Sequence, residues 1–529
     1  MMRNISFPHV FPLILAVLLA AGLAGAPQGA AAEADILIRN GRLLDGSGNP
    51  WLRADIAISG DRIVAVGDLA GMEADRTIDA AGLYVAPGFI DTHSHASGGL
   101  TRESTSPAEP LLAQGVTTVL LNPDGGGPVN LEGQREDLLE HGLGVNAAQM
   151  ISHGAVRRAV MDMDDRLPTD EELEEMKALV RAGMEAGAFA LSSGPFYAPG
   201  SYSDTAELIA LARVAAEYGT AYQSHIRDES DYTIGLVASV DEVIGIAREA
   251  ELPGIVTHIK ALGPGVWGYS EAVVRRIDMA REEGVEVWAD QYPYIASSTG
   301  LSSALVPRWA QAGGRSEFLA RMEDEETRGR IREGMVENLA RRGGADRITM
   351  RGGGEIAGRT LEEIAEERGL HPVDAAMELL EEGSPGIISF NMDERDVERF
   401  MRQPWTMTAS DGTLPRFGQG TPHPRGYGAF PRRLGVYTRD RGVVDLAMAI
   451  RSMTHLPASV YKMEDRGIIR EGAYADIVVF DLESVRDTAT FQDPHQLAEG
   501  MVYVLVNGGL AVDGGEFTGG MHGRALRRR

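Results

Sequence analysis

Runs of apolar and polar positions divide this chain into two kinds of segment. Near its beginning, and again near its end, short runs rich in isoleucine and valine are separated by turns that contain Gly, Asp or Asn. Such runs are typical of β-strands, and they cover residues 36–38, 56–58, 63–66, 477–480 and 502–506. Because strands from both ends flank a long middle, the pattern predicts one small composite β-domain formed by residues 33–85 and 466–529.

The middle of the chain, residues 86–465, alternates candidate strands with helical stretches. The first seven candidate strands end roughly 30–40 residues apart, which is the spacing of successive βα units. The predicted strand ends lie near Asp91, Asn122, Ile151, Ser192, His225, Ile259, Asp290 and Asp411. Eight such units predict an α/β fold with a (β/α)8 barrel of the TIM type rather than a doubly wound open sheet. The longer interval before the eighth strand predicts an insertion after strand seven, at about residues 299–405.

Residues 1–32 have the pattern of a secretion signal. Arg3 supplies a positive charge, an apolar run covers residues 11–26, and three alanines at residues 30–32 suit cleavage by a signal peptidase. The run is shorter than the roughly 20 apolar residues that a membrane-spanning helix needs, which disfavours an uncleaved anchor. The segment therefore predicts a cleavable signal peptide and a periplasmic or extracellular location.

The composition argues against some classes of binding partner and excludes one class of metal ligand. The 529 residues include 77 acidic and 50 basic ones, for a formal net charge of −27. A charge this negative argues against nucleic acid or an anionic membrane surface as a partner. No cysteine is present, so disulfides and thiolate ligands are excluded, and any transition-metal site must use His, Asp, Glu or water.

A pair of histidines marks the end of the first barrel strand, where residues 89–95 read Phe-Ile-Asp-Thr-His-Ser-His. Residues two apart in a strand point to the same face, so Asp91, His93 and His95 project together. Two neutral imidazoles can bind one divalent cation, and barrel active sites gather at this end of the strands. We therefore expect His93 and His95 to bind metal and Asp91 to be a buried supporting carboxylate.

Two further histidines and a carboxylate stand at equivalent strand ends. His225 and His258 end the fifth and sixth candidate strands, and Asp411 ends the eighth. Each alone could be a core histidine or a turn residue, but equivalent positions in a barrel direct side chains toward the same axis. We predict that His225 and His258 bind metal and that Asp411 moves a proton from water to the leaving group.

The arrangement on strands one, five, six and eight resembles the amidohydrolase superfamily. In particular, the chain is similar to the N-acyl-D-amino-acid deacylase (D-aminoacylase) family, from about residue 35 to residue 527. The likeness is carried by several motifs in the same order, which cover residues 85–95, 115–118, 190–197, 224–229, 290–294, 423–426 and 475–480.

The resemblance implies an activity, a cofactor and a set of substrate-binding residues. The implied reaction is metal-dependent hydrolysis of N-acyl-D-amino acids to a carboxylate and a free D-amino acid, with one or two Zn²⁺ ions or another divalent metal. The substrate, a small molecule, would be held through its carboxylate by Lys260 and Arg425, helped by Tyr197 and Tyr292. The arginine guanidinium, the lysine ammonium group and the tyrosine hydroxyl can all donate hydrogen bonds to a carboxylate.

One position departs from the family pattern. The family usually carries a metal-bridging cysteine after a Gly-Val-Thr-Thr segment, whereas Asp124 occupies that position here. A carboxylate can bridge two cations or complete one site, although it is a harder donor than a thiolate. Asp124 also precedes three glycines, so two interpretations stay open, a metal ligand and a turn residue. No lysine ends the fourth strand, and a carbamylated-lysine bridge is not expected.

A second short motif, residues 152–157, contains His153 and Arg157 at the end of the third strand. A similar segment occurs in the family. It either lines the substrate pocket or orders the neighbouring loops, and we predict that His153 and Arg157 line the pocket.

Two other functions remain as alternatives. One is a dipeptidase or a cyclic amidase of the hydantoinase or dihydroorotase type, from the same superfamily. A cyclic amide has no free α-carboxylate, so Lys260 and Arg425 would then lack a role. The other is a scaffold without metal or activity, and the four histidines and Asp411 argue against it.

Overall fold

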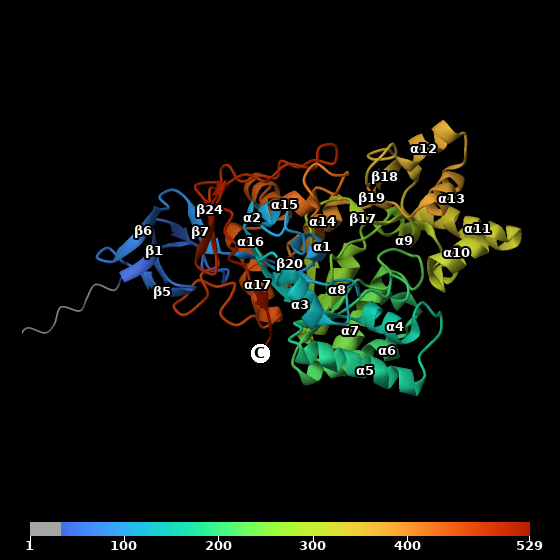
Figure 1. Ribbon diagram of the computed structural model, residues 1–529, viewed down its shortest axis with the longest axis horizontal. Coiled ribbons are helices and arrows are strands. Elements are labelled where there is room, and N and C mark those ends of the chain that lie inside the picture. The colour runs from blue at the N-terminus through green and yellow to red at the C-terminus, as the bar shows by residue number, and fades with distance from the viewer. Residues whose placement is uncertain (1–32, 529) are drawn as a thin grey trace, which may run out of the picture.

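The computed structural model describes residues 33–528. A β-rich region lies at one end of the molecule, an α/β region occupies the middle, and a mainly helical region forms the other end (Figure 1). The predicted signal peptide, residues 1–32, falls outside the described residues. Within the described part, no helix has both the length and the apolar composition that crossing a membrane requires.

The β-rich region contains strands from both ends of the chain. One sheet has the order β5-β4-β1-β6 and is built from β1 (Glu33–Arg39), β4 (Asp55–Ser59), β5 (Arg62–Gly67) and β6 (Glu73–Asp79). The other sheet has the order β25-β24-β23-β22-β7-β2-β3. Its strands are β2 (Arg42–Leu43), β3 (Leu52–Arg53), β7 (Tyr84–Pro87), β22 (Ile477–Phe480), β23 (Met501–Val506), β24 (Gly509–Asp513) and β25 (Glu516–Phe517). Strand β22 pairs with β7 in antiparallel register, and Ile38, Ile58 and Val479 share one apolar core.

Parallel strands follow one another in chain order through the middle region. They are β8 (Phe89–Asp91), β10 (Val116–Leu121), β11 (Asn146–Gln149), β12 (Ile151–Ser152), β13 (Ala190–Ser193), β14 (Ala221–Ser224), β15 (Gly254–Val256), β16 (Val287–Gln291) and β20 (Thr406–Thr408). One sheet has the order β26-β11-β10-β8, and the other has the order β12-β13-β14-β15-β16-β20. Only Met150 separates β11 from β12, so these two short strands form one interrupted strand that belongs to both sheets.

The first and last of these strands are also connected to each other. Strand β9 (Ser94–His95) follows β8, and β21 (Gly412–Thr413) follows β20. The two pair in parallel, with Gly412 opposite Ser94 and Thr413 opposite His95. The C-terminal strand β26 (Ala525–Leu526) pairs instead with β11, so the end of the chain leaves the β-rich region and lies against the central one.

Helices cover the outside of the parallel strands. They include α3 (Leu131–Leu139), α4 (His153–Met161), α5 (Asp170–Glu185), α6 (Thr205–Glu217), α7 (Leu236–Ala250) and α8 (Ser270–Glu282). Helix α5 begins at a capping box in which Thr169 and Glu172 satisfy each other's backbone N–H groups, a common signal for a helix start. Apolar residues of the helices, such as Val180, Leu211 and Val243, pack against strand residues in one core.

An insertion lies between β16 and β20, and all of it except its last helix, α14, extends toward the far end of the molecule (Figure 1). It contains β17 (Ser297–Gly300), α9 (Leu301–Leu305), α10 (Gly314–Glu323), α11 (Glu325–Arg341), β18 (Ile348–Arg351), α12 (Leu361–Arg368), α13 (Pro372–Glu382), β19 (Gly386–Ser389) and α14 (Glu394–Met401). Its three strands form an antiparallel sheet in the order β17-β19-β18. Residues such as Ile331, Ile348 and Val373 give the insertion an apolar core of its own.

Candidate metal centre

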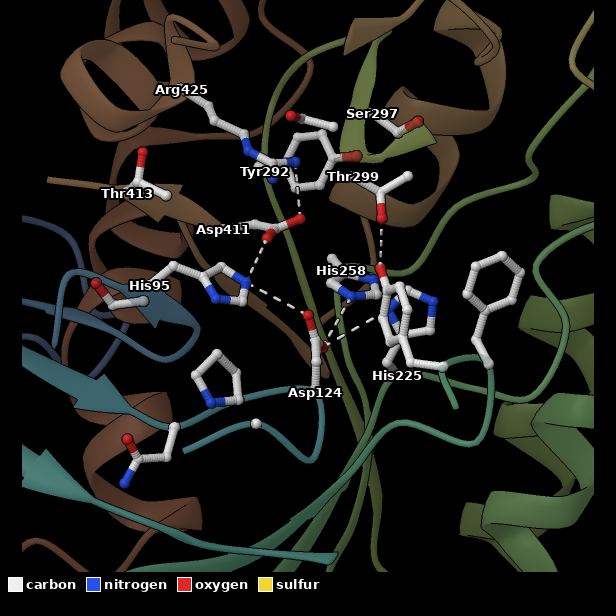
Figure 2. Close-up of a pocket in the computed structure, with 18 of the residues that line it drawn as sticks. His95, Asp124, His225, His258, Tyr292, Ser297, Thr299, Asp411, Thr413 and Arg425 are labelled. Atoms are coloured by element: carbon white, nitrogen blue, oxygen red, sulfur yellow. Dashed lines mark hydrogen bonds and ion pairs between the residues drawn. The ribbon is translucent and has the colours of Figure 1, made fainter. Parts of the chain in front are cut away.

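Six side chains from different strand ends meet in one place. His93 and His95 follow β8, Asp124 follows β10, His225 follows β14, His258 follows β15 and Asp411 follows β20. The carboxyl ends of adjacent parallel strands lie on the same edge of a sheet, which brings residues that are distant in sequence together. Figure 2 shows His95, Asp411, His225 and His258 arranged around Asp124.

The six residues form two potential metal-binding groups that share Asp124. One consists of His93, His95, Asp124 and Asp411, and the other of Asp124, His225 and His258. In each group the potential ligand atoms all lie within 4.8 Å of one another. Asp124 is therefore the residue that the two groups have in common.

The contacts of Asp124 are made by both of its oxygens. Oδ1 lies 3.2 Å from His93 Nε2 and 3.3 Å from His258 Nε2, and Oδ2 lies 3.3 Å from His95 Nε2. His225 Nδ1 is 3.6 Å from Oδ1. Asp124 also has a left-handed backbone, with φ 57°, so it is a turn residue whose carboxylate is directed into the cluster.

The donor set of the cluster fits a divalent cation. His93 Nε2 and both ring nitrogens of His225 are buried and have no hydrogen-bond partner in the described part of the chain. Buried polar nitrogens without a partner are costly, and a cation beside Asp124 would satisfy His93 Nε2 and His225 Nδ1, the two that lie near this carboxylate. Imidazole nitrogens with carboxylate oxygens are ligands that Zn²⁺ prefers.

Local charges keep both carboxylates of the cluster ionised. Burial alone would raise the pKa of Asp124, but His93 and His258 hold that pKa well below its usual range. Burial would likewise raise the pKa of Asp411, whereas Arg425 and then His95 lower it far more. Arg425 Nη1 lies 2.7 Å from Asp411 Oδ2. Ionised carboxylates are the form that binds metal or accepts a proton.

One buried carboxylate, Glu229, contacts the outer nitrogens of two of the histidines. Its Oε1 lies 3.0 Å from His258 Nδ1, and its Oε2 lies 3.7 Å from His225 Nε2. These are the ring nitrogens that face away from Asp124. Burial opposes ionisation of Glu229, but Lys260, 2.5 Å away, holds the pKa of Glu229 well below its usual range. A carboxylate behind a metal-binding imidazole fixes its tautomer and orientation.

We expect Glu229→Gln to weaken Zn²⁺ binding about 10- to 100-fold, because a carboxylate behind a ligating histidine strengthens the ligand. Competition with a chromophoric chelator measures this affinity directly. Glu242→Gln is the control, since Glu242 pairs with Arg227 rather than with a histidine. Equal Zn²⁺ affinities for Glu229→Gln and the wild type would contradict this role.

A cavity of about 460 Å³ opens beside the cluster. Tyr197, Lys260, Tyr292 and Arg425 all line it, together with the β17 residues 297–300. Tyr197 Oη lies 3.2 Å from Thr299 Oγ1, and the Arg425 guanidinium stands 4.6 Å from the centre of the Tyr292 ring. Figure 2 shows Arg425, Tyr292, Ser297 and Thr299 on the side of Asp411 away from Asp124.

The structure does not bring His153 and Arg157 to this cavity. Both belong to α4 and bind Glu207 of α6, with His153 Nε2 2.8 Å from Glu207 Oε1 and Arg157 Nη1 2.5 Å from Glu207 Oε2. All three side chains are buried. The helical path that begins at His153 carries these residues away from the strand ends, so they form a separate ion-paired group that belongs neither to the histidine–carboxylate cluster nor to the cavity lining.

Several residues around the cavity were not predicted from the sequence. Glu229 stands four residues after His225, and this spacing was a signal that could have identified it. Arg342, Arg351 and the hydroxyl residues of β17 come from the insertion. No motif in the sequence connects the insertion with the strand ends.

The chain is similar to a known enzyme family over most of its length. A family model described as the amidohydrolase family matches residues 76–512. The D-aminoacylase of Alcaligenes xylosoxydans xylosoxydans is 37% identical over 520 residues, which cover 93% of this chain and 98% of that protein. The N-acyl-D-glutamate deacylase of the same organism is 36% identical and covers 90% of this chain and 93% of its own length.

The fold of the chain also matches a solved structure. It is that of N-acyl-D-glutamate deacylase from Bordetella bronchiseptica, complexed with zinc and a phosphonate that mimics the tetrahedral intermediate. It matches with a TM-score of 0.78 and 34% identity, over 94% of this chain and 100% of that one. The match extends over nearly the whole chain, so the similarity includes the β-rich region and the insertion.

Proposed function

This chain belongs to the D-aminoacylase, or N-acyl-D-amino-acid deacylase, family of amidohydrolases, and from that premise we propose its activity. It is a metal-dependent hydrolase that cleaves the amide bond of N-acyl-D-amino acids to give a carboxylate and a free D-amino acid. The observation that carries this proposal is the convergence of four imidazoles and two ionised carboxylates beside a cavity lined by Lys260 and Arg425.

The metal would be held by residues of both groups. His225, His258 and Asp124 provide one site, and His93 and His95 provide a second site through the same Asp124. We propose Zn²⁺ as the metal, in one or both sites, because the donors are nitrogen and oxygen. When bound, such an ion supplies a Lewis acid for the amide carbonyl and lowers the pKa of water.

Asp411 moves the proton in this proposal. Its Oδ1 lies 3.2 Å from His95 Nε2, and its Oδ2 is held by Arg425. The ionised carboxylate takes a proton from the attacking water and later gives it to the departing amide nitrogen. Arg425 keeps Asp411 ionised and fixes its orientation before the reaction, which reduces the motion that proton transfer requires.

Other side chains that line the same cavity hold the substrate. We assign the α-carboxylate to Lys260 and Arg425 as cations and to Tyr197 and Tyr292 as phenol donors, all of which line the cavity. Holding the α-carboxylate at one end and the carbonyl at the other determines which face of the α-carbon is toward the metal ligands. D-selectivity follows from this positioning.

We also propose that the parallel strands form a closed (β/α)8 barrel, with a composite β-domain at residues 33–85 and 466–529. The β9–β21 pairing supports closure. The backbone N–H of Asp411 donates to the carbonyl of His93 at 2.9 Å, and the N–H of Ser410 donates to Asp91 Oδ1 at 2.8 Å. Both bonds connect the end of β20 to the end of β8, where the metal ligands lie.

Export is proposed on the pattern of residues 1–32 alone. Expression of the full chain in a bacterium, followed by N-terminal sequencing of the periplasmic fraction, tests it. We expect a mature protein that begins near residue 33. A full-length protein retained in the cytoplasm would contradict export and would leave the proposed activity unaffected.

The activity is tested by purifying the protein with Zn²⁺ and measuring release of the free amino acid. We expect turnover of N-acetyl-D-amino acids and at least about 100-fold slower turnover of the L-enantiomers, a difference of about 2.7 kcal/mol in transition-state binding. A hydantoin and a dipeptide serve as competing substrates. Turnover of only the hydantoin or the dipeptide, or of nothing by a fully metal-loaded protein, would refute the proposal.

A further inference from the structure

The cations around the cavity differ in how they are neutralised. Lys260 is paired with Glu229, and Arg425 is paired with Asp411. Arg342 and Arg351 also line the cavity, but neither has a carboxylate partner among the residues that the structure describes. Two positive charges of the insertion are therefore left for a ligand to neutralise.

Arg351 is supported in a specific position at the cavity wall. It ends β18 and lies opposite Gly386 of β19. A Cβ at residue 386 would lie only 2.8 Å from Arg351 Nε and 3.1 Å from Nη2, so the guanidinium lies directly over this glycine. Beyond it, Arg351 Nη1 donates to Ser298 Oγ of β17 at 3.2 Å. The absence of a side chain at Gly386 thus lets Arg351 cross the sheet to a strand that lines the cavity.

The surroundings of Arg351 make the guanidinium an anion-binding group. Burial lowers its pKa, and the nearby charge of Arg425 lowers it further, while Asp411 opposes both effects. Asp411 is thus the carboxylate near both arginines, and it is already paired with Arg425. Arg342, whose side chain is almost fully buried, has neutral partners: its Nε donates to the carbonyl of Ala304 at 3.4 Å, and its Nη1 donates to the side-chain amide oxygen of Asn391 at 3.3 Å. Buried cations without a carboxylate partner are costly, and an anionic ligand would remove that cost.

We propose that Arg351 binds a second carboxylate of the substrate, so that the preferred substrates are N-acyl-D-amino acids with an acidic side chain. This inference rests on the proposed function, in which the α-carboxylate is already held by Lys260, Arg425 and the two tyrosines. A second carboxylate could belong either to the amino-acid side chain or to a dicarboxylic acyl group. The side chain is favoured because Arg351 lies near Arg425, and the side chain branches from the same carbon as the α-carboxylate.

The test compares N-acetyl-D-glutamate with N-acetyl-D-glutamine, which has nearly the same shape but no side-chain charge. For the zinc-loaded wild type, we expect kcat/KM to be about 10- to 100-fold higher with the glutamate, the effect of one charge-assisted bond. In Arg351→Met, this ratio should fall close to 1. N-succinyl-D-leucine, whose second carboxylate is on the acyl group, should show no comparable advantage over N-acetyl-D-leucine.

Two further variants separate charge binding from a general structural effect. Gly386→Ala adds a methyl group beneath the Arg351 guanidinium without changing any residue that lines the cavity, so it should lower the glutamate-to-glutamine ratio as well. Arg359→Met is the matched control, because Arg359 lies in the same insertion, pairs with Glu367 and does not line the cavity. Its ratio should equal that of the wild type.

Several outcomes would overturn the inference. Equal kcat/KM values for glutamate and glutamine in the wild type would do so, as would an equal loss with both substrates in Arg351→Met. A preference for the succinyl substrate would assign Arg351 to the acyl group instead. These results all require turnover of N-acyl-D-amino acids, whereas failure of the proposed function would appear as no turnover of any of them.

Discussion

Asp411→Asn is expected to lower kcat by about 10²- to 10⁴-fold, the contribution that a positioned general acid–base residue makes. The amide of asparagine can neither take a proton from water nor return one to the leaving nitrogen. Its size is nearly that of the carboxylate, so the cavity and the Tyr292 wall should keep their shapes. Because Asp411 belongs to only one of the two potential metal-binding groups, the site of His225, His258 and Asp124 should still bind metal.

Elemental analysis and steady-state kinetics on the same preparation check this expectation. Asp440→Asn is a suitable control, because Asp440 is an exposed aspartate that pairs with Arg439 away from the cavity. A fall in kcat of less than 10-fold in Asp411→Asn, with at least one equivalent of metal retained, would show that another group transfers the proton.

Asp124→Ala is expected to remove most of the bound metal, because Asp124 is shared by both potential metal-binding groups. We expect kcat/KM to fall by at least about 100-fold as a result, since Zn²⁺ activation supplies several kcal/mol of transition-state stabilisation. Without its carboxylate, the site near His225 and His258 keeps two protein ligands, fewer than the three that catalytic zinc sites normally have. Metal content after dialysis against a weak chelator is the direct measurement.

Two other substitutions at residue 124 separate its ligand role from its turn role. Its backbone is left-handed, with φ 57°, a conformation that Asn tolerates and Ala does not favour. Asp124→Asn should therefore preserve the turn and still lose metal, whereas Asp124→Cys should preserve metal because thiolate is a good zinc ligand. Full metal content and an unchanged rate in Asp124→Asn would mean that residue 124 is only a turn residue.

The sequence was sufficient for the family and for much of the site. The predictions of an amidohydrolase related to D-aminoacylase, and of hydrolysis of N-acyl-D-amino acids, are confirmed by relatives that match nearly the whole chain. The predicted ligands and Asp411 do converge in the structure, although their individual roles stay predictions. They could be located because each stands where an apolar strand pattern ends, and those ends occupy one edge of a parallel sheet.

The sequence was less informative for residues whose local pattern does not indicate where they lie in the folded protein. His153 and Arg157 also stand at a strand end, but the chain turns into α4 at His153, and a helix carries its side chains in a different direction from a strand. Burying Arg157 then requires a partner, which Glu207 provides. Because 50 residues separate Arg157 from Glu207, the sequence around neither residue indicates that the two pair.

By itself, the sequence determined the order of the strands, the chemistry available at their ends and the absence of cysteine from the site. Only the tertiary structure decided that Asp124 is shared by two groups, that Glu229 contacts two histidines at once, and that Arg351 reaches the cavity across Gly386. The physical reason is that hydrophobic periodicity reports which face of one element is buried. Contacts between elements depend on how closely separate backbones approach, and here that approach is set by a glycine and by the packing of an insertion onto the strand ends.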